Sequence, residues 1–149
     1  MRNIVFKSIK ISNFKCHEYL EFEFVPSRLI LFTGHNGSGK TSVFSALFWA
    51  LYDETLEGIS GDNIVRKKSG KNTSVIVELE IDGVNYRIEA YRKHTKHKNN
   101  RYLFRNNENI SGPTNKDTLA MIENLLMPKN IFHNCLLFSN FNKEKFSDL

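Results

Sequence analysis

The stretch Gly34-His-Asn-Gly-Ser-Gly-Lys-Thr41 decides the fold, because it fits the phosphate-loop pattern G-x-x-x-x-G-K-[ST]. Its glycines permit the backbone angles that turn several N–H groups towards one anion. Lys40 supplies a positive charge for the β- and γ-phosphates, and the Thr41 hydroxyl is a ligand suited to Mg²⁺. The expected nucleotide-binding residues are Gly34, His35, Asn36, Gly37, Ser38, Gly39, Lys40, Thr41 and Ser42.

The flanks of this loop predict the strand, loop and helix that the motif needs. Residues 28–33 form an apolar run typical of a buried strand, and residues 42–52 predict a helix with apolar side chains on more than one side. The helix start would place a partial positive charge beneath the phosphates. A bare glycine turn between a core strand and a core helix is the alternative. The pattern and its context together favour a purine nucleoside triphosphate with Mg²⁺.

The rest of the chain predicts an α/β domain with a mixed or antiparallel sheet around that central helix. Alternating apolar residues predict strands over residues 4–12, 20–25, 73–81, 84–93 and 101–104, with a hairpin turn at Asp82-Gly83. Residues 57–72 have the polarity of a mobile surface loop, residues 115–127 predict an amphipathic helix, and residues 131–138 a further helix or extended segment. We therefore expect one lobe, residues 1–149, with a basic loop and hairpin insert at about 57–105 and a helical end at 115–149.

Positive charge is concentrated in that insert. The chain carries a net charge of +5, whereas residues 62–105 hold eleven basic and five acidic residues, a local charge of +6. Such a surface predicts a polyanionic partner, with a merely solvated face as the alternative. The candidate contacts to duplex DNA are Arg66, Lys67, Lys68 and Lys71. The aromatic residues interleaved with arginines are interpreted as core packing, namely Tyr86, Tyr91, Tyr102 and Phe104.

Cysteine usage and hydropathy bound the environment. Cys16 and Cys135 are far apart and lack metal-ligand spacing, which is typical of free thiols in a reducing compartment. No apolar stretch approaches the ~20 residues that span a bilayer, and the N-terminus lacks the apolar segment of a signal peptide. The expectation is a soluble, cytoplasmic protein with no membrane partner.

Several phrases in order along the chain resemble the N-terminal half of the SMC-like DNA-repair ATPases, in particular the SbcC-type, nuclease-associated branch and its phage relatives. The phrases that carry the resemblance are Ile9-Lys-Ile-Ser-Asn-Phe-Lys15, Phe22-Glu-Phe24, the phosphate loop with its flanks, Phe48-Trp-Ala-Leu-Tyr52 and Val77-Glu-Leu-Glu-Ile-Asp-Gly-Val-Asn-Tyr-Arg-Ile88. Together they extend through nearly the whole chain, which makes them more specific than the loop alone.

This resemblance implies an ABC-ATPase-like head that is split into two lobes. The N-terminal lobe carries the phosphate loop and a glutamine loop, and a long coiled coil follows. The C-terminal lobe supplies the signature motif, the Walker B acidic pair and the switch histidine. Two heads enclose two ATP molecules and regulate a nuclease in double-strand-break repair or recombination. The implied partners are the complementary C-terminal lobe, a second head in a homodimer, a nuclease subunit and duplex DNA, in a bacterium or a phage-infected cell.

Two further site residues follow from the resemblance. Lys15 falls where the family often has a basic residue near the nucleotide, so it is interpreted as a phosphate or adenine contact, with a solvated turn lysine as the alternative. Asn140 falls at the position of the glutamine-loop residue. Its amide oxygen is a candidate Mg²⁺ ligand beside Thr41, although its side chain is one methylene shorter. Lys40 and Asn140 are the candidate catalytic residues.

Hydrolysis needs groups that these 149 residues do not provide. A carboxylate must organise Mg²⁺ and the attacking water, but no strand of four or more apolar residues ends in Asp-Glu, and no LSGG-like signature occurs. We therefore expect weak nucleotide binding and negligible hydrolysis from this chain alone, with ATPase activity only after completion by the other lobe and dimerisation. The sequence ends where the family's coiled coil is expected to start.

Other phosphate-loop proteins remain as alternatives: a small-molecule kinase, an ABC transporter-type subunit or a nucleotide-sensing module. A hairpin directly after the first helix argues against the kinase, which usually continues with a parallel βα unit. The Ile-Ser-Asn-Phe-Lys opening favours the DNA-repair branch over the transporter type.

Overall fold

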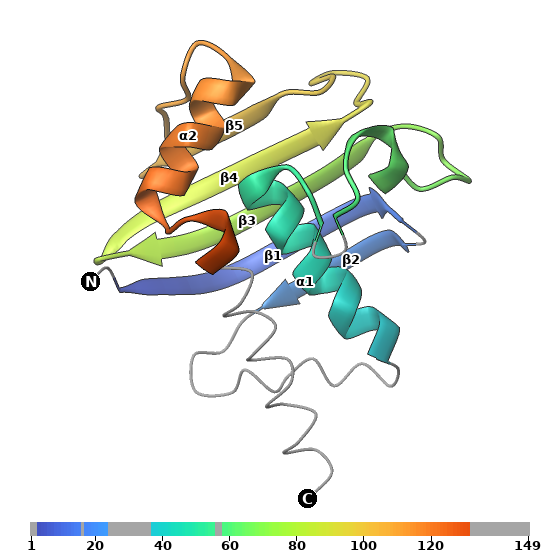
Figure 1. Ribbon diagram of the computed structural model, residues 1–149, viewed down its shortest axis with the longest axis horizontal. Helices are drawn as coiled ribbons and strands as arrows, with labels where there is room; N and C mark the ends of the chain where they lie inside the picture. The colour runs from blue at the N-terminus through green and yellow to red at the C-terminus, as the bar shows by residue number, and fades with distance from the viewer. Residues whose placement is uncertain (1–2, 16, 24–36, 56–57, 132–149) are drawn as a thin grey trace, which may run out of the picture.

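A computed structural model describes residues 3–15, 17–23, 37–55 and 58–131, with the backbone alone for residues 37–42. The described chain forms two layers, a twisted sheet and two helices that cover one of its faces (Figure 1). The helices are α1 (Gly37–Tyr52) and α2 (Asn115–Leu125), with a short 3₁₀ helix, η1 (Gly61–Ile64), between α1 and the third strand. The strands are β1 (Ile4–Phe14), β2 (His17–Glu23), β3 (Thr73–Ile81), β4 (Val84–Arg92), β5 (Arg101–Arg105) and β6 (Glu108–Asn109).

The strands follow the order β2-β1-β3-β4-β5-β6, and every described pairing is antiparallel. β1 pairs with both β2 and β3, so that Ile9 lies opposite Val77 and Ile11 opposite Val75. The predicted hairpin across Asp82-Gly83 is confirmed as β3–β4. The segment expected to hold the hairpin insert contributes β3, β4 and β5, which occupy the middle and one side of the sheet.

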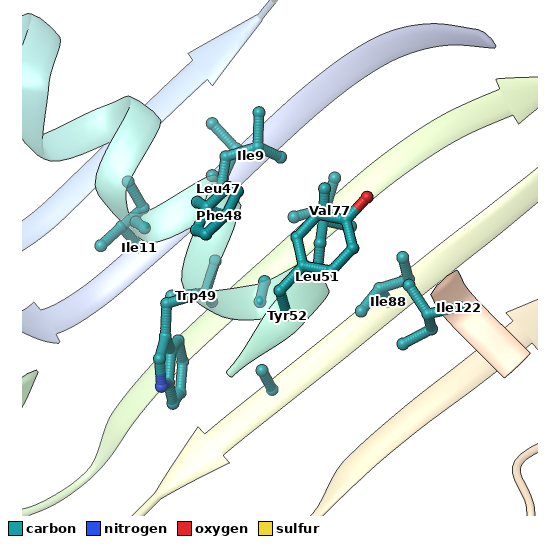
Figure 2. Close-up of a cluster of buried hydrophobic side chains, with 14 of the residues drawn as sticks. Ile9, Ile11, Leu47, Phe48, Trp49, Leu51, Tyr52, Val77, Ile88 and Ile122 are labelled. Atoms are coloured by element: carbon teal, nitrogen blue, oxygen red, sulfur yellow. The ribbon is translucent and has the colours of Figure 1, made fainter. Parts of the chain in front are cut away.

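The core lies between α1 and the sheet. From Val43 to Tyr52 every side chain of α1 is buried, as the apolar residues on more than one side of the helix predict. Alternate residues of β3 face this helix, and Val75, Val77 and Leu79 are almost completely buried. α2 covers the β5 side, where Ile122 reaches towards Ile88 of β4 (Figure 2). None of the helices within the described ranges is long and apolar enough to cross a membrane.

A buried arginine joins α1 to the sheet. Arg101 of β5 is 6% exposed. Its guanidinium donates to the backbone carbonyls of Ala50 at 3.0 Å and Trp49 at 3.1 Å, and to the Asp53 carboxylate at 3.2 Å. Burial lowers the pKa of Arg101, while the Asp53 charge acts in the opposite direction. The last carbonyls of a helix need partners from outside it, and Arg101 supplies one to Ala50 and a second one to Trp49, whose carbonyl also accepts from the Asp53 N–H at 2.8 Å. This arginine therefore anchors the end of α1 to β5.

Several sequence-based boundaries differ from the structure. α1 begins at Gly37 rather than at residue 42, β1 continues to Phe14, β2 begins at His17, and α2 ends at Leu125. The strand predicted at residues 28–33 and the segment predicted at 131–138, beyond its first residue, lie outside the described residues.

The prediction of a mobile surface loop at residues 57–72 is wrong in its middle. Ile64 and Val65 are buried there, and Val65 pairs with Phe14 in an isolated β-bridge. These two apolar residues fill the space beside the end of β1, which holds the loop against the sheet. Because polar residues flank Ile64 and Val65 on both sides, the sequence did not indicate that these two residues are buried.

Candidate functional site

The phosphate-loop residues enter the structure at the start of α1. Residues 37–42 form the first helical turns, whereas Gly34, His35 and Asn36 lie outside the described residues, as does Asn140. The structure therefore places the backbone at Lys40 and Thr41 but not their side chains. The first N–H groups of a helix have no intrahelical acceptor, and they carry the positive end of the helix dipole. The start of α1 thus has the electrostatics of an anion site.

Tertiary packing holds α1 in position over its whole buried length. The Trp49 ring lies 5.9 Å from the Phe14 ring, centroid to centroid, and the Arg101 guanidinium lies 5.2 Å from the centre of the Trp49 ring. Phe48 and Tyr52 also pack together, with 5.0 Å between ring centroids. A helix fixed at its C-terminal half cannot shift along its axis without breaking these contacts. The first turn is therefore held where the sheet and Arg101 place it.

A sharp turn between β1 and β2 places Lys15 next to the basic loop, which we define as residues 66–71. Asn13 and Lys15 both take left-handed backbone angles, with φ of 51° and 56°, which are uncommon outside glycine. The Lys15 N–H donates to the Ile64 carbonyl at 2.8 Å, and the Arg66 N–H donates to the Asn13 carbonyl at 2.9 Å. Residues 13–15 and 64–66 thus form one hydrogen-bonded unit.

This unit lines a cavity of about 550 Å³. Ile59 and Val65 contribute apolar surface, and Lys15 and Arg66 contribute positive charge. The complete lining is Lys15, Ile59, Asn63, Val65, Arg66, Lys67 and Lys68. The sequence assigned Lys15 to the nucleotide and the other basic residues to DNA, whereas the structure brings them to one cavity. Lys71 belongs to the same loop but is not part of the lining.

Asn13 organises the basic loop, and the sequence did not identify it. Its Oδ1 accepts from the Ser69 hydroxyl at 2.7 Å, and its Nδ2 donates to the Asn72 carbonyl at 3.1 Å. Its own carbonyl accepts from the Thr73 hydroxyl at 2.6 Å. The Arg66 guanidinium in turn donates to the Ser69 hydroxyl at 2.9 Å. The tolerance of asparagine for left-handed angles was the available signal.

Electrostatics around the cavity leave it cationic. Lys67, Lys68 and Lys71 are exposed, and no carboxylate within the described ranges pairs with them. Asp62 of η1 is already neutralised, since it accepts from Arg92 Nε at 2.8 Å and lies 3.7 Å from Lys93 Nζ. The hydrogen bond from Arg92 lowers the pKa of Asp62. Burial, followed by the Lys15 charge, lowers the pKa of His17, which favours its neutral form.

Comparisons with known proteins identify a family and several relatives of this chain. The AAA_23 family, described as an AAA domain, matches residues 8–149. The chain is 28% identical over 147 residues to the DNA double-strand break repair Rad50 ATPase of Methanocaldococcus jannaschii, covering 99% of this chain and 14% of that protein. It is 32% identical over 95 residues to the DNA replication and repair protein RecF of Lachnoclostridium phytofermentans, covering 64% of this chain and 26% of that one.

The fold is similar to that of a solved repair protein. The structure of the recombination mediator protein RecF-ATPrS in the RecFOR pathway superposes with a TM-score of 0.55 at 17% identity. The match covers 80% of this chain and 29% of that chain. The α/β arrangement expected of an ABC-ATPase-like lobe is therefore confirmed. The chain spans only a minor part of each of these relatives.

Proposed function

The chain belongs to the AAA_23 family of AAA domains, as an N-terminal lobe of the SMC-like ATPase type, and from this premise we propose that it supplies one half of a composite ATP site in DNA double-strand-break repair or recombination. One observation carries the proposal. Residues 37–41 of the phosphate-loop sequence form the first turns of α1, whose residues 43–52 are buried, in a lobe whose described sheet is antiparallel. A small-molecule kinase would continue after this helix with parallel βα units, and the described strands do not.

The described residues fit a magnesium nucleotide at the start of α1. The N–H groups of its first turn offer donors to phosphate oxygens, and the helix dipole favours the negative charge. In the proposed site, Lys40 neutralises the β- and γ-phosphates and Thr41 ligates Mg²⁺. Residues 34–39 and Ser42 contribute backbone donors, and Asn140 is proposed as a further Mg²⁺ ligand. The metal would supply charge neutralisation at the transferred phosphoryl group.

The cavity beside Lys15 is the proposed site for the non-phosphate end of the nucleotide. Its volume of about 550 Å³ is within the range that small ligands and cofactors occupy. The apolar surface of Ile59 and Val65 suits the face of a purine, while Lys15 and Arg66 suit polar edge atoms or phosphate.

Catalysis is proposed to require a second lobe. This chain binds ATP weakly and hydrolyses it negligibly by itself, because the carboxylates and the signature motif belong to the complementary C-terminal lobe and to the second head of a homodimer. ATP-driven closure of the two heads would then regulate a nuclease subunit on duplex DNA. The proposed location is the cytoplasm of a bacterium or a phage-infected cell.

Nucleotide titration of the 149-residue chain tests the first part of the proposal. With a fluorescent ATP analogue and Mg²⁺, Lys40→Ala is expected to abolish measurable binding, and Thr41→Ala to remove its dependence on Mg²⁺. The matched control is Lys116→Ala, which removes an exposed lysine at the start of α2 and leaves binding unchanged. Equal binding by the wild-type chain and the K40A variant would contradict the proposal.

Salt-dependent DNA binding tests the second part. Binding of duplex DNA is expected to weaken steeply with salt, and exchanging Lys67, Lys68 and Lys71 for glutamate is expected to reduce the slope of log K against log[salt] by about 0.9 per lost phosphate contact. Lys116→Glu is the control for a single unrelated charge. A slope unchanged by the triple substitution would remove the basic loop from the DNA surface.

A further inference from the structure

The sheet has a second face, opposite α1 and α2, which we call the open face. Within the described residues no helix covers it (Figure 1). Three of the aromatic side chains interpreted from the sequence as core packing lie on this face, where Tyr91 is buried as predicted and Tyr102 and Phe104 are half-buried. Tyr91 on β4 and Tyr102 and Phe104 on β5 alternate with the core residues Ala90 and Leu103. Tyr86 packs against the core on the helix-covered side, as predicted.

These rings form a continuous row together with two histidines from the β4–β5 connection. The row consists of Phe104, Tyr102, His97, Tyr91 and His94. Tyr102 lies 6.5 Å from Phe104 and 5.6 Å from His97, and His97 stacks on Tyr91 at 4.2 Å, all between ring centroids. The Arg87 guanidinium lies 4.2 Å from the centre of the Phe104 ring. Tyr102 and Phe104 are half-buried and therefore present part of their surface to a ligand.

The connection between β4 and β5 forms an ordered basic tip, residues 93–98, at one end of this row. The N–H groups of His94 and Lys98 donate to each other's carbonyls at 3.0 and 2.8 Å. His94 Nδ1 accepts from the N–H groups of Lys96 and His97, each at 3.1 Å. Lys96 and Lys98 project from this tight turn into solvent. No ion pair involves either lysine within the part of the chain that the structure describes.

The basic tip is also joined to the basic loop. Asn72, which follows Lys71, accepts from the Thr95 N–H at 2.8 Å and from its hydroxyl at 2.9 Å. The Asn72 N–H donates to the Lys93 carbonyl at 2.9 Å. Positive charge therefore continues from the proposed duplex-binding loop to the aromatic row.

Charge divides the open face into two halves. The β1–β3 half carries four glutamates and two lysines: Glu80 pairs with Lys7 at 3.2 Å, Lys10 lies opposite Glu21, and the others are Glu23 and Glu78. On the aromatic half, Glu89 lies opposite Tyr102 but is already neutralised, because it accepts from Arg87 Nε at 2.7 Å and from the Tyr91 hydroxyl at 2.6 Å. The β1–β3 half thus keeps a net negative charge, so a polyanion is favoured on the β4–β5 half over the other.

We propose that the aromatic row and the basic tip bind unpaired nucleotides of single-stranded DNA. Bases would stack on Tyr102, on Phe104 and on the plane of Arg87, while Lys96 and Lys98 contact the phosphates. Aromatic platforms beside positive charge suit single strands, because their base faces are free, whereas duplex bases already stack on one another. Joined to the duplex-binding loop, this surface would hold the unpaired strand at a junction of double- and single-stranded DNA.

Fluorescence anisotropy with a labelled thymidine oligomer of about ten nucleotides tests the proposal, using the 149-residue chain without ATP. Tyr102→Ala is expected to weaken binding about ten-fold or more, and Tyr102→Phe to restore it, since only the ring is needed. Exchanging Lys96 and Lys98 for glutamate is expected to reduce the salt slope by about 0.7 for each contact. The matched control is Tyr19→Ala on the acidic half of the same face, where the side chain is 54% exposed.

Three results would overturn the inference. They are full binding by the Y102A variant, an equal loss from Tyr19→Ala, and equal competition by a duplex of the same length when Lys67, Lys68 and Lys71 are exchanged for glutamate. A folded wild-type chain, shown by circular dichroism, that does not bind the oligomer would also contradict the proposal. The assay omits ATP, so its outcome is independent of the proposed nucleotide site.

Discussion

The two faces of the sheet are built from the same strands but have opposite chemistry. On β3, the residues facing α1 are Val75, Val77 and Leu79, all buried, whereas the intervening residues include Ser74 and Glu78 on the open face. The helix-covered face excludes water and secures the start of α1. The open face retains side chains that can meet a partner. Because successive side chains of a strand point to opposite faces, alternate residues of the same strand contribute to the core and to the surface that can bind a partner.

A pair of phenylalanines provides the largest test of this separation. Phe14→Ala removes a fully buried ring that packs against Trp49, and we expect it to lower the free energy of unfolding by about 3–5 kcal/mol. Phe104→Ala removes a half-buried ring from the open face and is expected to cost about 1 kcal/mol, mainly its contact with Arg87. Urea unfolding followed by circular dichroism measures both, and equal losses would mean that the open face is also core.

Two arginines provide the next test. Arg101→Met removes the buried donor to the Ala50 carbonyl and one of the two donors to the Trp49 carbonyl, and a loss of about 1–3 kcal/mol in unfolding free energy is expected. Arg92→Met breaks a more exposed pair with Asp62 and should cost at most about 1 kcal/mol. Thermal unfolding at fixed pH compares them. If the R92M variant is the less stable of the two, the proposal that Arg101 anchors the end of α1 is contradicted.

A smaller effect is expected at the start of α2, which covers the β5 side. The Thr114 side chain accepts from the Asp117 N–H at 3.2 Å as the N-cap. Thr114→Ala is expected to destabilise the protein by about 1 kcal/mol. Thr95→Ala on the basic tip removes one exposed hydrogen bond and should change stability by less than about 0.5 kcal/mol. Urea midpoints at equal m-values distinguish the two variants.

The smallest effect concerns pH and the basic tip. Burial, together with the charges of His97 and Lys96, lowers the pKa of His94. The folded state therefore binds a proton at His94 less readily than the unfolded state does. The stability that neutral His94 contributes is complete above the unfolded pKa of about 6.5. That contribution is lost as pH falls below this value, because a protonated Nδ1 cannot accept from Lys96 and His97.

Amide exchange measures this local opening. The Lys96 and His97 N–H groups should exchange faster relative to the core amides of β3 as pH decreases from 7 to about 5, after correction for intrinsic rates. In the variant His94→Gln this acid-dependent step should be absent. If the relative protection of these two amides does not change with pH, the depressed pKa has no structural consequence.

The predictions from sequence succeeded where the signal was local. The alternation of residues 73–81 and the Asp82-Gly83 turn predicted the β3–β4 hairpin, because strand period and turn propensity are properties of adjacent residues. The predictions failed where the position of a residue depends on contacts with residues far away in the sequence. Nothing near Tyr102 indicates which side of β5 the helices cover, and nothing near Val65 indicates its bridge to Phe14.

The sequence by itself determined the phosphate-loop motif, the apolar helix after it and the family to which the chain belongs, because each depends on residue types at fixed spacing. Only the tertiary structure decided that Lys15 and Arg66 line one cavity, that Arg101 anchors the end of α1, and that an aromatic row faces away from the core. These features depend on the order in which strands pair and on the face that the helices cover. The strand order and the covered face both depend on how the complete chain buries its apolar surface, which no short stretch of sequence specifies.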